Sequence, residues 1–238
     1  VKTLYKHNID TFGTTFGSHE NYFVNGNRDD SKKIIPFLIT RQIFTGSGSI
    51  IRERSGSGKY IISQRSPFIQ KDLSLDTIMQ RGIINLRKEE LSNVEGHYRL
   101  HLILGDSNMC ETATFLKLGT TNLVLKLLEE DKLPKIDYSQ SCSVLDNFRI
   151  STFYNNWELS GIQSGSNKAV DVQRAYFDAC IKNNYDSLDT ITHELLSQWY
   201  NVLNDLENII KEPHNLYGTL DWVTKIPIIN SLKKDFGF

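Results

Sequence analysis

Side chains suited to metal and phosphate chemistry gather around the strand-like segments of the first half of the sequence. They comprise two histidines, one asparagine and three arginines. Imidazole nitrogens are suitable inner ligands for a divalent metal ion, and guanidinium groups form bidentate, charge-assisted bonds with phosphate oxygens. The combination indicates a site for a nucleotide together with a metal ion. The candidate residues are His19, Asn21, Arg65, Arg87, Arg99 and His101.

The same residues also have simpler structural explanations. A single histidine on a strand is more often a surface or hydrogen-bonded residue than a metal ligand, and His19 and His101 belong to separate segments. An arginine at a strand end is usually a solvated charge or part of a surface ion pair. The pattern therefore describes a site only if the strands bring these side chains together on one face.

Four strand-like segments are expected to position the candidates. His19–Val24 and Tyr98–Leu104 alternate, so each directs its candidate side chains to one face. Lys59–Gln64 and Gly82–Leu86 are shorter, and each ends immediately before a candidate arginine. An antiparallel sheet that rests one face on helices leaves the other face to solvent or ligand. We therefore predict that the candidates line that second face.

The chain is predicted to be mostly helical from about residue 107, which makes it an α+β protein. Residues 46–58, rich in glycine and serine, are interpreted as a mobile loop or hairpin. The irregular segment Arg149–Gly165 is open to a hairpin, and Gly119 is a point at which a long helix can divide. The predicted helices run from Asp30 or Ser31 to about Thr45, from Asn108 to Glu130 with Ser107 as the cap, from Ala169 to Lys182, and from Ser187 to Lys211.

Composition narrows the class of protein. The 238 residues suffice for one large domain, or for a main domain with a small appendage. Lys and Arg total 27 against 28 for Asp and Glu, so no overall positive field would gather nucleic acid or an anionic membrane. No apolar run reaches the roughly 18 residues of a membrane span, and the three cysteines lack CxxC spacing, so we expect a cytoplasmic protein.

Eight short sequence motifs are spread over nearly the whole chain, and their order indicates a family resemblance that no single motif would establish. They are Tyr5-Lys6-His7-Asn8-Ile9-Asp10, Gly17-Ser18-His19-Glu20-Asn21-Tyr22, Thr40-Arg41-Gln42-Ile43-Phe44-Thr45-Gly46, Ile62-Ser63-Gln64-Arg65, Ile83-Ile84-Asn85-Leu86-Arg87-Lys88-Glu89, Tyr98-Arg99-Leu100-His101-Leu102-Ile103-Leu104-Gly105-Asp106-Ser107-Asn108-Met109, Leu116-Lys117-Leu118-Gly119-Thr120-Thr121 and Leu220-Asp221-Trp222-Val223-Thr224-Lys225. The series resembles the Pup ligase and Pup deamidase/depupylase family, within the glutamine synthetase-like carboxylate-amine ligase superfamily.

This resemblance implies a curved antiparallel sheet backed by helices, together with roles for the candidates. His19 and His101 are similar to metal ligands of the family, and Arg65, Arg87 and Arg99 are similar to its phosphate or nucleotide contacts. Asn21 would complete the shell of nucleotide contacts. The implied cofactors are ATP, or ADP or phosphate, and Mg, which as a hard ion needs oxygen ligands in addition to imidazole.

The sequence also departs from the family pattern. The Glu-x-Glu strand and the aspartate that the family uses as base or nucleophile do not precede Val1, and the usual C-terminal segment does not follow Phe238. We therefore expect 1–238 to be a fragment or divergent core, incomplete at both ends, whose catalytic residues are unknown. Lys88-Glu89-Glu90 replaces the familiar Asp-Glu-Pro.

The resemblance leaves three functions open. In the first, a nucleotide- and Mg-dependent hydrolase deamidates Pup or removes it from proteins. In the second, a ligase uses ATP to activate the terminal glutamate of Pup for attack by a lysine. In the third, a non-catalytic relative binds Pup or a similar disordered peptide. Ser74-Leu75-Asp76-Thr77 and Gly119-Thr120-Thr121 favour the hydrolase, whereas Gly105-Asp106-Ser107-Asn108-Met109 favours the ligase.

Overall fold

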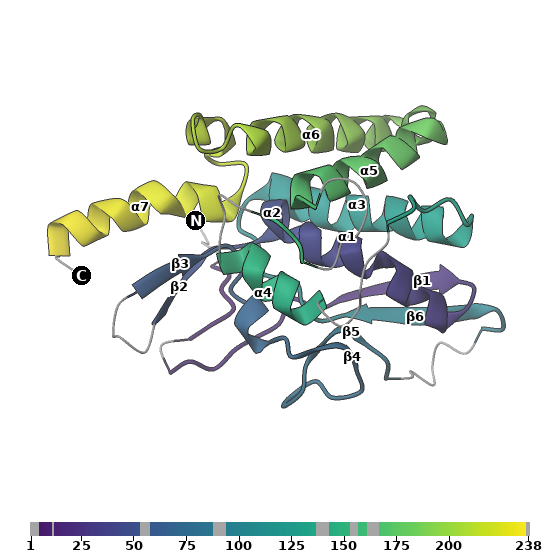
Figure 1. Cartoon of the computed structure of the whole chain (residues 1–238), viewed down its shortest axis with the longest axis horizontal. Helices are drawn as coiled ribbons and strands as arrows, with labels where there is room; N and C mark the ends of the chain where they lie inside the picture. The colour runs from purple at the N-terminus through teal and green to yellow at the C-terminus, as the bar shows by residue number, and fades with distance from the viewer. Residues whose placement is uncertain are drawn as a thin grey trace.

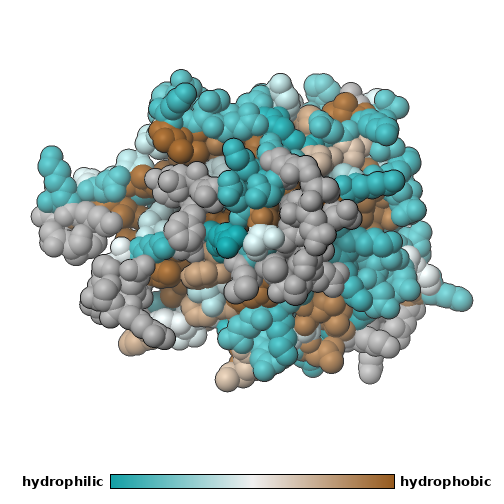
Figure 2. All heavy atoms as spheres, in the orientation of Figure 1, coloured by the Kyte–Doolittle hydropathy of each residue, from teal (hydrophilic) through white to brown (hydrophobic). Residues whose placement is uncertain are grey.

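The computed structural model describes residues 5–10, 12–52, 58–87, 94–136, 143–152, 157–160 and 167–236. Helices lie over one side of a four-stranded sheet, with α6 in the layer farthest from it (Figure 1). Hydrophilic residues dominate the upper edge of the molecule, where α6 runs (Figure 2). Because separate helices cover one side of the sheet, the fold is α+β, as the sequence predicts.

The four-stranded sheet consists of β1 (Glu20–Asn25), β6 (His97–Leu102), β5 (Gly82–Asn85) and β4 (Lys71–Ser74), in that order. β1 pairs with β6 and β6 with β5, and both pairs are antiparallel, as expected for the sheet that the sequence indicates. β4 was not predicted, and it pairs with β5 in parallel. The connection between them is held by Asp76, whose carboxylate accepts hydrogen bonds from the amides of Ile78, Met79 and Gln80.

The glycine- and serine-rich segment contains a hairpin. β2 (Ser49–Arg52) pairs antiparallel with β3 (Gly58–Ile61) in a separate two-stranded sheet. The predicted strand Lys59–Gln64 is thus shorter than expected, and its last residues form a turn before η2 (Ser66–Phe68). The predicted mobility of 46–58 falls partly on residues 53–57, which lie outside the described residues.

The first helix was predicted as one continuous element with a cap at Asp30 or Ser31, and both parts of this prediction are wrong. It is divided into η1 (Arg28–Ile34), α1 (Ile35–Thr40) and α2 (Gln42–Thr45). The cap is Asn27, whose side chain accepts a hydrogen bond from the amide of Asp29, instead of Asp30 or Ser31. Pro36 cannot donate an amide hydrogen, so α1 starts anew around it.

The later helices follow the predictions more closely. α5 (Ala169–Lys182) has the predicted bounds, and α6 (Thr190–Glu207) lies within the predicted range. α3 (Glu111–Glu129) continues through Gly119, because the missing side chain there admits Leu195 of α6, whose methyl carbons lie 2.6 Å from the position of a Cβ.

Two helices of the second half were not predicted. α4 (Ser143–Thr152) occupies part of the segment interpreted as irregular, and α7 (Asp221–Phe236) follows the short turn η6 (Pro213–Leu216). A further short turn, η5 (Tyr185–Ser187), lies between α5 and α6. Pro227 lies inside α7, which is why the sequence gives a weak helix signal there. Part of Arg149–Gly165 lies outside the described residues, so the hairpin suggested there is tested only at the bridge between Glu158 and Lys168.

The start of α3 is fixed by the first residue of α7 rather than by its own sequence. Asp221 is buried and accepts hydrogen bonds from the amides of Met109 and Cys110, at 2.6 and 3.2 Å. It also accepts one from the side chain of Asn108 at 2.9 Å. A carboxylate at a helix N-terminus accepts hydrogen bonds from free amides and interacts favourably with the positive end of the helix dipole. The predicted cap Ser107 instead donates its amide to Asn8.

Replacement of this cap tests how strongly α7 holds α3. We expect Asp221→Ala to lower the free energy of unfolding by about 2–3 kcal/mol, because it leaves buried donors without an acceptor. Urea denaturation followed by circular dichroism measures the change. Asp189, the exposed N-cap of α6, provides the matched control, and Asp189→Ala should cost about 1 kcal/mol. Equal losses for the two variants would contradict the special role of Asp221.

Candidate functional site on the outer face of the sheet

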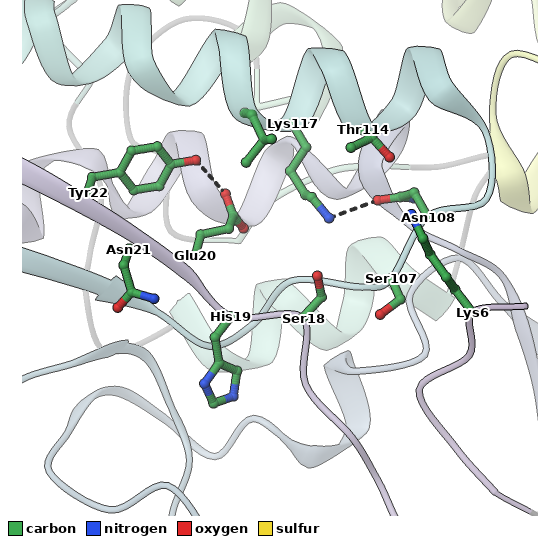
Figure 3. A pocket seen from close by; sticks show the side chains of 11 residues that line it. Lys6, Ser18, His19, Glu20, Asn21, Tyr22, Ser107, Asn108, Thr114 and Lys117 are labelled. Carbon is green, nitrogen blue, oxygen red and sulfur yellow. Dashed lines mark hydrogen bonds between the residues drawn. The ribbon is translucent and has the colours of Figure 1, made fainter. Parts of the chain in front are cut away.

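Strand β1 separates two chemically different faces. Glu20 and Tyr22 point toward α3, whereas His19 and Asn21 point away from it (Figure 3). We call the side of the four-stranded sheet turned away from α3 its outer face. Phe23 belongs to the outer face by alternation along the strand.

The structure brings the two candidate histidines together on the outer face. His101 Nε2 and His19 Nδ1 lie 3.1 Å apart, and the ring centroids lie 5.0 Å apart. His19 precedes β1 and His101 lies near the end of β6, so the sheet register creates the contact between residues 82 apart in sequence. The predicted convergence is confirmed, and the role of the pair as metal ligands stays a prediction.

Polar residues continue across the sheet on both sides of His101. Asn21 pairs with it from β1 and Asn85 pairs with it from β5. Residues paired in register point to the same face, so the three side chains form one row. Arg99, two residues before His101 on β6, donates to Asn21 Oδ1 at 3.1 Å. Asn21 and Arg99 therefore belong to the same outer-face site as the histidines.

Arg65 reaches this site from the turn after β3. Its side chain is 2% exposed, and its guanidinium donates to Thr15 Oγ1 at 2.6 Å and to the carbonyl of Ile103 at 3.3 Å. Gly17 makes the approach to His19 possible, because a Cβ there would lie 2.5 Å from the His19 ring and 3.2 Å from Arg65 Nη2. The guanidinium and the histidine pair thus share one compact cluster.

The charges of this cluster act on one another. Burial and the positive charge of Arg81 together lower the pKa of Arg65 to about 10, and Asp106 opposes the change. Burial also lowers the pKa of His19, and the positive charges of Arg65 and Arg81 act in the same direction. A neutral imidazole with a free lone pair is the form that binds a metal ion. The positive charge of the cluster favours an anionic ligand.

Arg87 occupies a different environment from the other candidates. It is exposed just beyond the end of β5, and its backbone amide donates to Asn85 Oδ1 at 2.9 Å. The predicted strand did deliver it to the sheet edge, but its contact with a nucleotide stays a prediction. The replaced motif at Lys88-Glu89-Glu90 lies outside the described residues.

Asp106 is the residue that fixes the position of Arg65. Its buried carboxylate accepts hydrogen bonds from the amides of Arg65, Gln64 and Ser47, at 3.0, 2.9 and 2.8 Å. The hydroxyls of Ser47 and Ser63 add two more, at 3.1 and 3.0 Å. Burial raises the pKa of Asp106, and the backbone donors oppose that rise. One side chain thereby joins the turn after α2, the turn after β3 and the segment after β6.

A cavity of about 380 Å³ lies between the edge strand β1 and α3, and its lining includes His19 and Asn21 as well as the inner residues Glu20 and Tyr22. Glu20 forms a buried ion pair with Arg41 at 2.5 Å and accepts a hydrogen bond from Tyr22 at 2.7 Å. Lys117 Nζ donates to the carbonyl of Asp106 at 2.7 Å. It also donates to Asn108 Oδ1 at 3.1 Å (Figure 3). Burial lowers the pKa of Lys117. These polar groups therefore have partners within the protein, and their contacts hold β1 against the helices on its inner side.

Sequence reasoning missed three residues of the site as individual participants. Arg81 precedes β5 in a loop and has no periodic signal. Asn85 could have been found, because alternation places it on the face of Arg87. Asp106 lies in a quoted string, but its set of donors depends on turns distant in sequence. Among the described ranges, no group of three His, Cys, Asp or Glu side chains is arranged to hold a metal ion, and no helix is long and apolar enough to cross a membrane.

The arrangement of sheet, helices and site places the chain in a class of solved proteins. The Pup ligase PafA in complex with ADP is similar to it with a TM-score of 0.81 and 29% identity, over 99% of this chain and 53% of that one. PafA in complex with Pup gives a TM-score of 0.80 and 28% identity, over 98% and 48%. The fold is therefore that of a Pup ligase. The sequence model of the family described as Pup-ligase protein matches residues 2–238, and the chain belongs to this family.

Curated relatives include both kinds of enzyme. The chain is 35% identical to the depupylase of Acidothermus cellulolyticus, over 97% of this chain and 47% of the relative. It is 34% identical to the Pup deamidase/depupylase of Mycobacterium tuberculosis, over 97% and 47%, and 32% identical to the Pup–protein ligase of Nakamurella multipartita, over 98% and 52%. The chain thus spans about half the length of these relatives.

A substitution of Asp106 tests its control over the site. Asp106→Asn places an amide donor against groups that themselves donate, so we expect a loss of about 2–4 kcal/mol in the free energy of unfolding. Asp76→Asn is the matched control, because Asp76 also accepts three backbone amides but is only partly buried. Chemical denaturation measures both. A loss at Asp106 no greater than at Asp76 would contradict the account.

Proposed function

We propose that the protein acts on Pup, in a nucleotide- and Mg-dependent hydrolysis of the amide or isopeptide bond at the side chain of its C-terminal residue. The observation that carries the proposal is the cluster formed by His19, His101 and Arg65 on the outer face of the sheet. In this account Arg65, Arg99 and Asn21 contact the nucleotide and the two histidines contact the metal ion. Arg87 approaches the phosphates from the end of β5.

Unsatisfied donors on the described residues support an anionic ligand. The Arg65 Nε and Asn85 Nδ2 groups are buried and have no acceptor among the residues that the structure describes. Buried donors without acceptors are costly, and phosphate oxygens are strong acceptors. These two groups therefore fit a site organised around phosphate.

The histidine pair fits part of a magnesium shell. Its two ring nitrogens face each other at 3.1 Å, which marks one point where both can approach a ligand. Mg prefers oxygen ligands, so phosphate oxygens, water and groups beyond the described residues have to supply the remainder. When bound, the ion neutralises charge on the phosphates. The residues of this chain orient the nucleotide and exclude water from Arg65.

The proposed partner is Pup or a Pup-like disordered peptide. A similar solved structure is a complex of Pup with its ligase, and several relatives are Pup deamidases or depupylases. A disordered peptide binds in an extended groove and orders as it binds. We place the reaction in the cytoplasm, in keeping with the absence of CxxC-type cysteine spacing.

Ligation is the second candidate, and one observation favours it. The similar solved structures named above are ligases, and their TM-scores reach 0.81. A ligase transfers the γ-phosphoryl group of ATP to the terminal carboxylate of Pup, and a lysine amine then displaces the phosphate. Hydrolysis needs only water as the attacking group. The same outer-face cluster would hold the nucleotide in either reaction.

Reaction direction is tested by supplying the chain in turn with Pup ending in glutamine, with a Pup conjugate, and with Pup ending in glutamate together with a lysine acceptor. With ATP or ADP and Mg, we expect ammonia release from Pup ending in glutamine and free Pup from a Pup conjugate. The hydrolysis should not consume ATP in proportion to product. Formation of a Pup–lysine bond with one ATP consumed per bond would establish the ligase instead. Peptide binding without any product would establish the non-catalytic alternative.

The histidine cluster is tested separately from the reaction. His101→Ala should weaken binding of ADP with Mg by at least about tenfold, because it removes one of the two ring nitrogens that face the ligand. Isothermal titration calorimetry measures the affinity. His193→Ala, on the exposed side of α6, should leave both affinity and circular dichroism unchanged. If His101→Ala binds ADP with Mg as tightly as the wild type does, the histidine pair has no role in binding the metal ion and nucleotide.

A further inference from the structure

An exposed pair of stacked rings lies on the outer face, beyond the polar cluster. The rings of Phe23 and His97 are nearly parallel, with an interplanar angle of 7° and a centroid distance of 4.7 Å. Phe23 is a large apolar side chain and is 57% exposed, although its neighbours on the outer face, Asn21 and Arg99, are polar. Its ring therefore offers a flat apolar surface that the protein itself leaves uncovered in part.

The ring pair is aligned with the phosphate cluster along the strands. His19, just before β1, and residues 21 and 23 on β1 point to the outer face, and on β6 residues 97, 99 and 101 do so. Each step is about 7 Å, so the rings lie two steps, or about 14 Å, from the histidine pair. Arg99 lies between them, directly across from Phe23 and bonded to Asn21.

The outer face therefore changes character in one direction. At one end are the histidine pair and Arg65, in the middle are Asn21 and Arg99, and at the other end is the ring of Phe23. A nucleotide has the same sequence of properties, from phosphates through a polar sugar to a flat aromatic base. Bases stack on aromatic side chains, and such stacking tolerates different bases because each has a π-face.

We propose that the exposed ring of Phe23, held flat by His97, is the stacking platform for the base of the bound nucleotide. The proposal rests on the proposed function, since the phosphates have to occupy the cluster around Arg65. It goes further by assigning the base to a residue pair at the far end of the strands. His97 acts as a positioning residue, because it fixes the plane of the Phe23 ring through their contact.

The experiment compares a ligand that has a base with one that lacks it. ADP and inorganic pyrophosphate are each titrated with Mg into the wild-type chain and into Phe23→Ala. We expect the variant to bind ADP about 5- to 150-fold more weakly and to bind pyrophosphate unchanged. Tyr200→Ala, which removes another partly exposed aromatic ring on α6, is the control and should change neither affinity.

A second variant reports stacking directly and does not depend on loss of affinity. Phe23→Trp should retain ADP binding, and its exposed indole should lose fluorescence as ADP saturates the site but not with pyrophosphate. The native tryptophans at 157, 199 and 222 are 7%, 0% and 0% exposed, so they form a constant background.

The outcomes separate this proposal from the proposed function. Wild-type binding of pyrophosphate and ADP, with ADP affinity unchanged in Phe23→Ala and no quenching in Phe23→Trp, overturns the platform and leaves the phosphate site standing. Equal weakening of both ligands in Phe23→Ala overturns the platform too, because the effect is then not on the base. Binding of neither ligand by the wild-type chain overturns the phosphate site and the platform together. Quenching by a Pup peptide alone assigns the ring to peptide binding instead.

Discussion

A single buried carboxylate holds the candidate site in place. Asp106 accepts five hydrogen bonds, three from backbone amides and two from hydroxyls, and these donors come from the two turns that flank the β2–β3 hairpin. The amide of Arg65 is one of them, so the carboxylate sets where that guanidinium leaves the chain. The carbonyl of the same residue accepts a hydrogen bond from Lys117 of α3. The outer face thus depends on a helix from the opposite side of the sheet.

Strand β1 transmits this order to the histidines. Its inner side chains are tied to the helices by the Glu20–Arg41 ion pair, which is almost completely buried. Breaking a buried ion pair is costly, so the strand cannot slip by one residue without losing it. Because side chains alternate, the register that places Glu20 inside also places His19 and Asn21 outside. The support and the candidate site therefore use adjacent residues of one segment of the chain.

Much of this arrangement could be predicted from local patterns. The alternation of β1 and β6 gave the outer face, and the apolar spacing of α5 gave a helix with the observed bounds. Features set by distant contacts could not be predicted in the same way. The cap of α3 comes from Asp221, which lies more than a hundred residues later in the sequence. Gly119 is kept inside α3 because the side chain of Leu195 packs into the space that a Cβ would occupy. β4 lacks clear alternation and pairs in parallel through a loop organised by Asp76. Alternation and strand ends were enough to predict the candidate residues of the outer face. Arg81, Asn85 and Asp106 were missed as individual participants.

The most direct test of this account is a crystal structure of the chain with ADP and Mg. It should show the diphosphate on the outer face of the sheet, with its oxygens within hydrogen-bond distance of the Arg65 guanidinium and next to the His19–His101 pair. A diphosphate on the other side of β1, in the cavity between Glu20 and Lys117, would contradict the account.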